Sequence, residues 1–255
     1  MIKSLAIYGD SFGTRSLSKD YDRQLKGLSH HWSTLLQQEY NCELTNYALS
    51  GSSVYYSYKE FERTNHLHDL IIFLVTEPNR YIKPLHFFGG EQWCITNQVQ
   101  IDVWKKTMSL STDDRELLKK LEHWFELSDE DYQYDNSELM VDKISSVGPH
   151  VIVIPCYKIS YRDEYKEKLQ LPNDVNLCSL YYAQMNEFQF TDTGMGIKWD
   201  ENSEFISGHL TPEYNKIAYE NISYYIKNRV WNWNIPNSKI IDTPNKDNYY
   251  IKLRG

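Results

Sequence analysis

Four short apolar runs interrupt an otherwise polar chain, at residues 3–8, 42–48, 69–76 and 150–155. The last two runs are almost continuously apolar, which is typical of strands that are buried on both faces of a sheet. Segments with large apolar residues at helical spacing separate the runs, so strands and helices alternate along the chain. This alternation predicts an α/β fold with a central parallel sheet.

The same pattern predicts where the helices lie. The expected helices are His31–Glu39, Ser52–Arg63 with Ser52 or Ser53 as its N-cap, two helices that begin near Thr112 and Ser128, and Pro212–Arg229. For residues 177–188 a helix is preferred, whereas 14–30, 157–175 and 190–208 are polar and are predicted to be loops. Residues 80–110 break the alternation and are interpreted as an insertion that covers or flanks a site at the strand ends.

The first apolar run ends in Gly9-Asp10-Ser11-Phe12-Gly13, which predicts a tight turn after a buried strand. Ligands of open parallel α/β sheets bind at the carboxyl ends of the strands, so a serine in this turn is well placed for chemistry. The alternative is that Asp10 and Ser11 only cap a following helix. Gly51 and Asn79 each follow another predicted strand, and His209 stands just before the last predicted helix.

Ser, Gly, Asn and His in this order resemble the SGNH (GDSL-type) hydrolase superfamily over residues 3–229, with residues 8–12 as the most specific block. The resemblance implies a three-layer α/β/α sandwich of the flavodoxin-like type. It also implies a serine esterase in which Ser11 is the nucleophile and His209 is the general base. The oxyanion would be held by the backbone N–H groups of Ser11 and Gly51 and by the side chain of Asn79.

The block around Asn79 departs from the family pattern. The family has Gly-x-Asn-Asp where this chain has Thr-Glu-Pro-Asn-Arg at residues 76–80, so a slip of one residue would place Glu77 or Arg80 in the site instead. An arginine there would favour an anionic substrate. The alternative is that Arg80 is a solvated loop charge.

The block before His209 departs further. The family has Asp-x-x-His, whereas Ile206 stands three residues before His209. The orienting acid would then come from Glu204 or Asp200, or a backbone carbonyl would hold the imidazole in a Ser–His dyad. The rival hypothesis is a non-catalytic binding or structural protein on the same fold, with a phage origin. Phosphoester chemistry is a third option, which would need a metal or more basic groups.

Composition and charge narrow the function classes. The 255 residues suit one domain, taken as residues 1–230 with an insertion at about 80–148 and a C-terminal arm at 231–255. A net charge of −8 argues against nucleic acid as the main partner. No apolar run reaches the roughly 20 residues that a membrane span requires, and no signal-peptide pattern opens the chain, so a cytoplasmic location is expected.

No metal or cofactor is expected. The four cysteines, Cys42, Cys94, Cys156 and Cys178, are widely spaced and contain no Cys-x-x-Cys pair, which predicts free buried thiols. The spacing of His66 and His68 could suit a metal on a strand, but no third ligand is evident nearby.

The expected substrate is a small ester. Carbohydrate O-acetyl groups are the first choice, because of the family analogy and because 21 tyrosines and 7 tryptophans can supply sugar-binding surfaces. Asp10, Arg80 and Tyr55 are the candidate substrate contacts. Homo-oligomerisation is left open.

Overall fold

A four-stranded sheet with the strand order β2-β1-β3-β6 forms the centre of the protein in the computed structural model. Its strands are β1 (Ser4–Tyr8), β2 (Glu43–Asn46), β3 (Leu70–Val75) and β6 (Val151–Pro155). All three strand pairings are parallel, which confirms the predicted sheet. The structure describes residues 2–10, 12–13, 31–49, 52–78, 80, 85–87, 91–93, 101, 105, 111–127, 129–157, 160–172, 175–180, 210 and 212–235.

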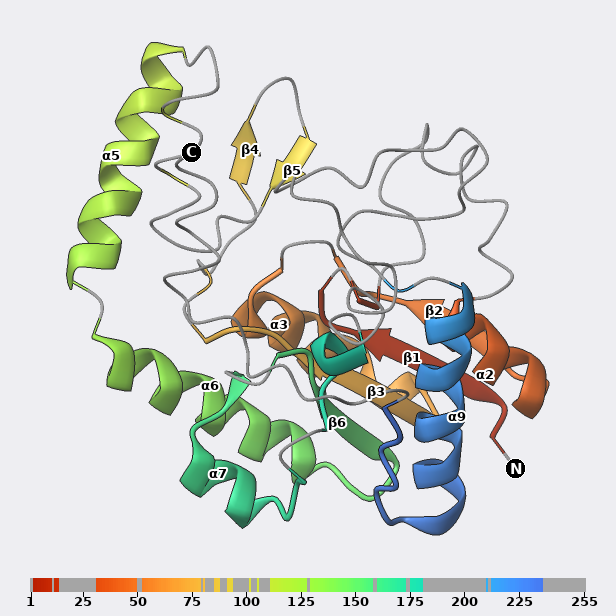
Figure 1. The fold of residues 1–255 in the computed structure, drawn as a ribbon. Helices are drawn as coiled ribbons and strands as arrows, with labels where there is room; N and C mark the ends of the chain where they lie inside the picture. Colours follow the sequence, from red (N-terminus) through yellow and green to blue (C-terminus); the bar gives the residue numbers. More distant parts are fainter. Residues whose placement is uncertain are drawn as a thin grey trace, which may run out of the picture.

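Helices cover both faces of this sheet (Figure 1). On one face α2 (Trp32–Tyr40) packs against α9 (Pro212–Asn228), and on the other α3 (Val54–Thr64) packs against α6 (Glu130–Ser145). A further long helix, α5 (Thr112–Leu127), precedes α6 and extends beyond the sandwich (Figure 1). The predicted three-layer α/β/α architecture is therefore confirmed.

Side chains cap the first turns of two helices, and one of them, Ser53, was among the expected caps. The ring of His31 accepts a hydrogen bond from the amide of Ser33 at 3.3 Å and caps α2. The hydroxyl of Ser53 accepts from the amide of Tyr56 at 3.2 Å and caps α3. These contacts satisfy amide groups that have no partner within their own helix.

The alternation of side chains along the strands divides the core into two clusters. On β1, Leu5 and Ile7 belong to the cluster that faces α2 and α9, whereas Ala6 and Tyr8 belong to the cluster that faces α3 and α6. Successive side chains of a strand point to opposite faces, so a strand between two helical layers needs apolar residues at every position. All six residues of β3 are accordingly buried.

The strand order reverses between β1 and β3, and this reversal determines where a site can form. The chain passes from β1 outward to β2, returns to β3 on the other side of β1, and continues to β6. In open parallel sheets such a reversal leaves a crevice at the carboxyl ends of the two central strands. The register pairs Tyr8 with Phe73, so the segments that follow β1 and β3 leave the sheet side by side.

Two segments differ from the prediction. Residues 157–175, predicted as a loop, contain the six-residue helix α7 (Asp163–Lys168). Acidic residues in its first turn and lysines in its last turn favour the helix dipole, but so short a helix has too little apolar periodicity to be recognised. Within the predicted insertion, β4 (Leu85–Phe87) and β5 (Glu91–Trp93) pair as an antiparallel hairpin. The glycine pair between them is a hairpin signal that the pattern analysis missed.

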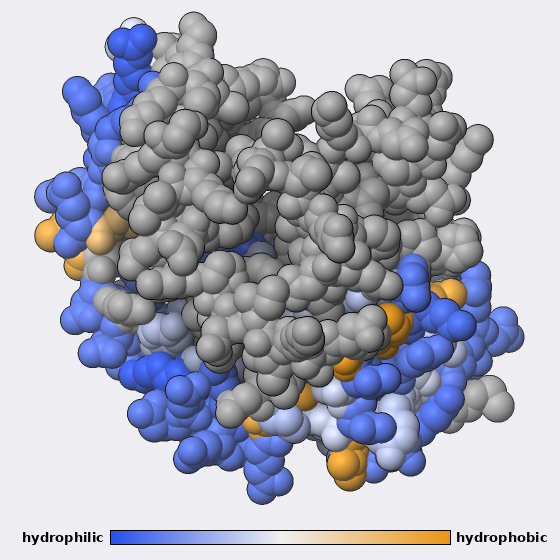
Figure 2. Space-filling model, in the orientation of Figure 1, coloured by the Kyte–Doolittle hydropathy of each residue, from blue (hydrophilic) through white to orange (hydrophobic). Residues whose placement is uncertain are grey.

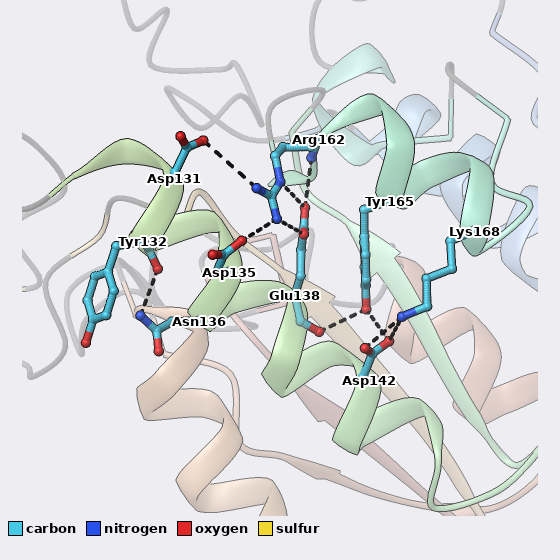
Figure 3. A network of polar contacts seen from close by, with 9 residues as sticks. All are labelled: Asp131, Tyr132, Asp135, Asn136, Glu138, Asp142, Arg162, Tyr165 and Lys168. Carbon is cyan, nitrogen blue, oxygen red and sulfur yellow. Dashed lines mark hydrogen bonds and ion pairs between the residues drawn. The ribbon is translucent and has the colours of Figure 1, made fainter.

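A polar network fastens the segment around α7 to α6 (Figure 3). The guanidinium of Arg162 pairs with Glu138 at 2.6 Å, and Lys168 pairs with Asp142 at 2.7 Å. The hydroxyl of Tyr165 donates to the carbonyl of Glu138 at 2.9 Å and to the carboxylate of Asp142 at 2.8 Å. These contacts hold the chain that leaves β6 against α6.

The outer surfaces of α5, α6 and α7 are mostly hydrophilic in the view of Figure 2. This is expected for helices whose apolar side faces the sheet or a neighbouring helix. Within the part of the chain that the structure describes, no helix combines the length and the apolar character that crossing a membrane requires.

Candidate active site

The predicted site residues are flanked by residues whose contacts the structure describes. Six predicted residues lie outside the described part of the chain: Ser11, Gly51, Asn79, Asp200, Glu204 and His209. Their immediate neighbours along the chain are described at Asp10, Phe12, Ser52, Arg80 and Leu210. The contacts of these neighbours show how the segments that carry the predicted site meet.

The chain leaves β1 in a tight turn from Asp10 to Gly13. The amide of Gly13 donates to the carbonyl of Asp10 at 3.0 Å, and the amide of Phe12 donates to Asp10 Oδ1 at 3.1 Å. An aspartate that accepts from the amide two residues ahead stabilises a turn locally. The side chain of Asn46, at the end of β2, donates to the carbonyl of Gly13 at 2.7 Å and holds the far side of the turn.

Gly9 allows the end of β1 to approach β3 closely. Its φ is +131°, and a Cβ at this position would lie 2.5 Å from Leu74 Cβ and 2.7 Å from the Leu74 carbonyl oxygen. The carbonyl of Gly9 accepts from the amide of Leu49 at 2.9 Å and from the hydroxyl of Ser52 at 2.6 Å. Residues on both sides of Gly51 are therefore tied to the end of β1.

Arg80 is buried, with 6% of its surface exposed, so the interpretation of this residue as a solvated loop charge is wrong. Its Nη1 lies 3.1 Å from Asp10 Oδ2 and donates to the carbonyl of Ser52 at 3.3 Å. Its Nε lies 3.5 Å from a carboxylate oxygen of Glu77. The residue after Asn79 thus contacts both the residue before Ser11 and the residue after Gly51.

Tyr157 and Cys156, directly after β6, complete the surroundings of this ion pair. Arg80 Nη2 donates to the hydroxyl of Tyr157 at 2.8 Å, and the thiol of Cys156 donates to Asp10 Oδ1 at 3.3 Å. Burial, and then the nearby Asp10 carboxylate, raise the pKa of Cys156, so the thiol stays neutral and remains a donor. Burial alone would lower the pKa of Arg80, but Tyr157, Asp10 and Glu77 raise it, so the guanidinium stays charged.

The segments that carry Ser11 and His209 are joined through Trp32. The indole nitrogen of Trp32 donates to the carbonyl of Phe12 at 2.9 Å, and its amide donates to Asn215 Oδ1 at 3.2 Å. The side chain of Asn215, near the start of α9, donates in turn to the carbonyl of Leu210 at 2.8 Å. Three hydrogen bonds therefore connect the residue after Ser11 with the residue after His209.

Sequence reasoning identified Asp10 and Arg80 but missed Cys156, Tyr157 and Trp32. Cys156 and Tyr157 directly follow the fourth predicted strand, so their place at the carboxyl edge of the sheet was an available signal. Trp32 was assigned only to a helix, because nothing local shows that its indole reaches the turn after β1. Tyr55, the third candidate substrate contact, is 39% exposed in the first turn of α3.

The described residues offer no cluster for a metal. Among them, no group of three or more histidine, cysteine, aspartate or glutamate side chains could hold a metal ion. His66 lies in a 3-10 turn (Asn65–Leu67) ahead of β3 and not on a strand. Cys42, Cys156 and Cys178 are buried thiols that form no disulfide, as predicted, and Cys94 lies outside the described residues.

Comparison with known proteins found no matching family model and no matching curated protein. Similar solved structures include one from Desulfitobacterium hafniense, described as a lipolytic protein of the G-D-S-L family. It is 16% identical to this chain with a TM-score of 0.36, and the match covers 87% of this chain and 98% of that chain. The esterase EstA from Pseudoalteromonas is 12% identical with a TM-score of 0.39, over 88% and 97%. A carbohydrate acetylesterase family member from Sinorhizobium meliloti is 12% identical with a TM-score of 0.34, over 88% and 97%. These similar structures thus include proteins that are described as esterases or as members of the G-D-S-L family.

Proposed function

We propose that this protein is a serine hydrolase that cleaves a small ester, with Ser11 as the nucleophile and His209 as the general base. The observation that carries the proposal is the set of contacts made by Arg80. Arg80 follows Asn79 and bonds the neighbours of Ser11 and Gly51, so all three proposed oxyanion positions belong to segments that are joined at one point. That point lies at the reversal of strand order, where open parallel sheets bind ligands.

The contacts of Trp32 support the place of the general base. They link Phe12 to Leu210, and these residues directly follow the proposed nucleophile and the proposed base. A serine and a histidine can act together only when their side chains come within hydrogen-bond reach. The link holds the two segments at the same edge of the sheet, as this role requires.

In the proposed reaction, the hydroxyl of Ser11 attacks the ester carbonyl while His209 takes its proton. The negative oxygen that forms accepts hydrogen bonds from the amides of Ser11 and Gly51 and from the side chain of Asn79. His209 returns the proton to the departing alcohol, which leaves an acyl-serine. Water then attacks this acyl group with His209 again as base, and the acid and free serine are released.

The proposed substrate class is a small ester, with O-acetyl groups on a carbohydrate as the first to test. Tyr55 is proposed as a contact, because an exposed aromatic ring can pack against a sugar. The insertion at about 80–148 is proposed to flank the site within a domain of residues 1–230, with residues 231–255 as an arm. The phosphoester option has little support, because the arginine that suggested it faces two carboxylates.

Covalent labelling of the folded protein with a fluorophosphonate tests the proposal. We expect one label on Ser11, loss of labelling in Ser11→Ala, and loss of p-nitrophenyl acetate turnover in both Ser11→Ala and His209→Ala. Asn79→Ala should lower turnover by about 10²–10³-fold, as is typical when one oxyanion donor is removed. The absence of labelling in folded protein would favour the second candidate, a non-catalytic protein on this fold. The motivation for this candidate is Ile206, which stands where the family has an aspartate.

A further inference from the structure

We propose that Arg80 is a positioning residue whose guanidinium clamps the turn around Ser11 to the segment after Gly51 and so sets the spacing of the oxyanion donors. The inference rests on the proposed function and goes beyond it, because it gives a role to a residue that stands where the family pattern has an aspartate. In this role Arg80 acts through its neighbours Asp10 and Ser52.

The clamp follows from how the guanidinium is used. Nη1 reaches Asp10 Oδ2 at 3.1 Å and the carbonyl of Ser52 at 3.3 Å, while Nη2 reaches the Tyr157 hydroxyl at 2.8 Å. Three segments of the chain therefore meet on one rigid, planar group. The geometry depends on the fork of an arginine, because a lysine offers a single point charge on a flexible stem.

Asp10 passes this restraint on to the turn. Its Oδ1 accepts from the amide of Phe12 at 3.1 Å and from the thiol of Cys156 at 3.3 Å. The carboxylate is thus held on one oxygen by the turn and on the other by Arg80. A movement of Arg80 would remove one restraint from Asp10, whose other carboxylate oxygen is bonded to the turn that contains Ser11.

A direct role of Arg80 in binding an anionic substrate does not fit its surroundings. Asp10 and Glu77 place two carboxylates around one guanidinium, so an incoming anion would meet net negative charge. The side chain is also buried beneath its partners, and Tyr157 covers it with its ring centroid 5.3 Å from Arg80 Cζ. Exposing a buried charge would require breaking these contacts, which is costly.

The test compares Arg80→Lys and Tyr157→Phe with the wild-type chain. Tyr157→Phe removes only the acceptor of Nη2 and leaves the ion pair in place. The readouts are kcat and KM for p-nitrophenyl acetate, which is neutral, and for mono-p-nitrophenyl succinate, which is anionic, together with the rate of fluorophosphonate labelling. Lys227→Met is the matched control, because Lys227 forms an ion pair with Glu39 near the C-terminal ends of α2 and α9.

We expect kcat and the labelling rate to fall about 10- to 100-fold in Arg80→Lys, in line with the effect of small misplacements of catalytic groups. Tyr157→Phe should give a smaller fall of the same kind, and KM should stay unchanged for both esters. The control should keep the wild-type kcat.

If the wild-type chain is not labelled at all, the proposed function fails. If it is labelled and both variants keep its kcat, or if KM rises for the anionic ester alone, the positioning role is wrong. Should Arg80→Lys fail to fold, Tyr157→Phe decides the question.

Discussion

The indole nitrogen of Trp32 donates a hydrogen bond to the carbonyl of Phe12 at 2.9 Å. This bond joins α2 to the turn that follows β1. Trp32 is fully buried, and its amide bonds Asn215 near the start of α9. One residue therefore connects the segments of the proposed nucleophile and the proposed base, which lie at opposite ends of the sequence.

Trp32→Phe should lower both stability and turnover. The variant removes the hydrogen bond from the indole to the Phe12 carbonyl, and the loss of one such bond typically costs about 0.5–1.5 kcal/mol. We expect the free energy of unfolding in urea to fall by this amount and kcat to fall as the turn loosens. Trp231→Phe is the control, because Trp231 stacks on Tyr225 at 4.0 Å beyond the end of α9. Equal losses of kcat in both variants would contradict a specific role for the Trp32 bond.

Arg80→Gln and Asp10→Asn should be strongly coupled in stability. Removing one partner of a buried ion pair leaves an uncompensated charge, which typically costs about 3–5 kcal/mol. We expect each single variant to lose free energy of unfolding on this scale and the double variant to lose clearly less than the sum of the two. Urea denaturation of the four proteins measures the coupling. Strictly additive losses would show that the two side chains do not interact as a buried pair.

Gly9→Ala should destabilise the protein severely. Alanine disfavours a φ of +131°, and its Cβ would collide with the backbone and the Cβ of Leu74 in the neighbouring strand. We expect a loss of about 3 kcal/mol or more in the free energy of unfolding, or no folded protein. Gly148→Ala is the matched control, because Gly148 also has a positive φ but its added Cβ would meet only the side chain of His150, at 3.0 Å. A similar cost at both positions would contradict the close approach of β1 to β3.

The contribution of Asp142 to stability should depend on pH. Burial opposes ionisation of this carboxyl, but its bonds with Lys168 and Tyr165 outweigh that effect and lower its pKa below the ordinary value of 3.8. Its contribution is therefore complete above the pKa of the unfolded chain and is lost as the pH falls through the lower pKa of the folded protein. Asp142→Asn should cost about 1 kcal/mol at pH 7, because the ion pair is partly exposed, and the difference from the wild type should shrink toward pH 3.

Thermal or urea unfolding of the two proteins across this pH range measures the difference. Glu116→Gln serves as the control, because Glu116 forms an exposed pair with Lys120 at 3.7 Å and should change stability little at any pH. A difference between Asp142→Asn and the wild type that does not shrink as the pH falls below 3.8 would contradict the assignment.

The acid that orients His209 should come from the segment before it, because Ile206 has no acceptor in its side chain. Glu204→Gln is expected to lower kcat by up to about 10⁴-fold if Glu204 holds the imidazole, and Asp200→Asn if Asp200 does. Activity on p-nitrophenyl acetate, with His209→Ala as the reference for complete loss, measures the effect. Unchanged turnover in both acid variants would indicate a dyad, and serine-dependent turnover in His209→Ala would show that the base is wrongly assigned.

The sequence by itself determined the sheet and its layers. The apolar run that became β3 is buried at every position and the run that became β6 is buried or half-buried throughout. A strand between two helical layers needs apolar residues on both faces, so the pattern can be recognised locally. The cap of α3 was predicted for the same reason, since a capping side chain bonds amides only two or three residues away. Helix α7 and the β4–β5 hairpin were not predicted, because their strands and helix are too short to show an apolar periodicity that distinguishes them from a loop.

Only the tertiary structure decided the role of Arg80. Nothing near it in the sequence distinguishes a solvated loop charge from a buried one, because its partners Asp10, Ser52 and Tyr157 come from the ends of other elements. They meet because β1 and β3 are neighbours in the sheet with β6 beside them, an order that no local pattern in the sequence specifies. Local patterns specify which segments become strands and helices, whereas the contacts that join the strand ends depend on how those elements are arranged in space.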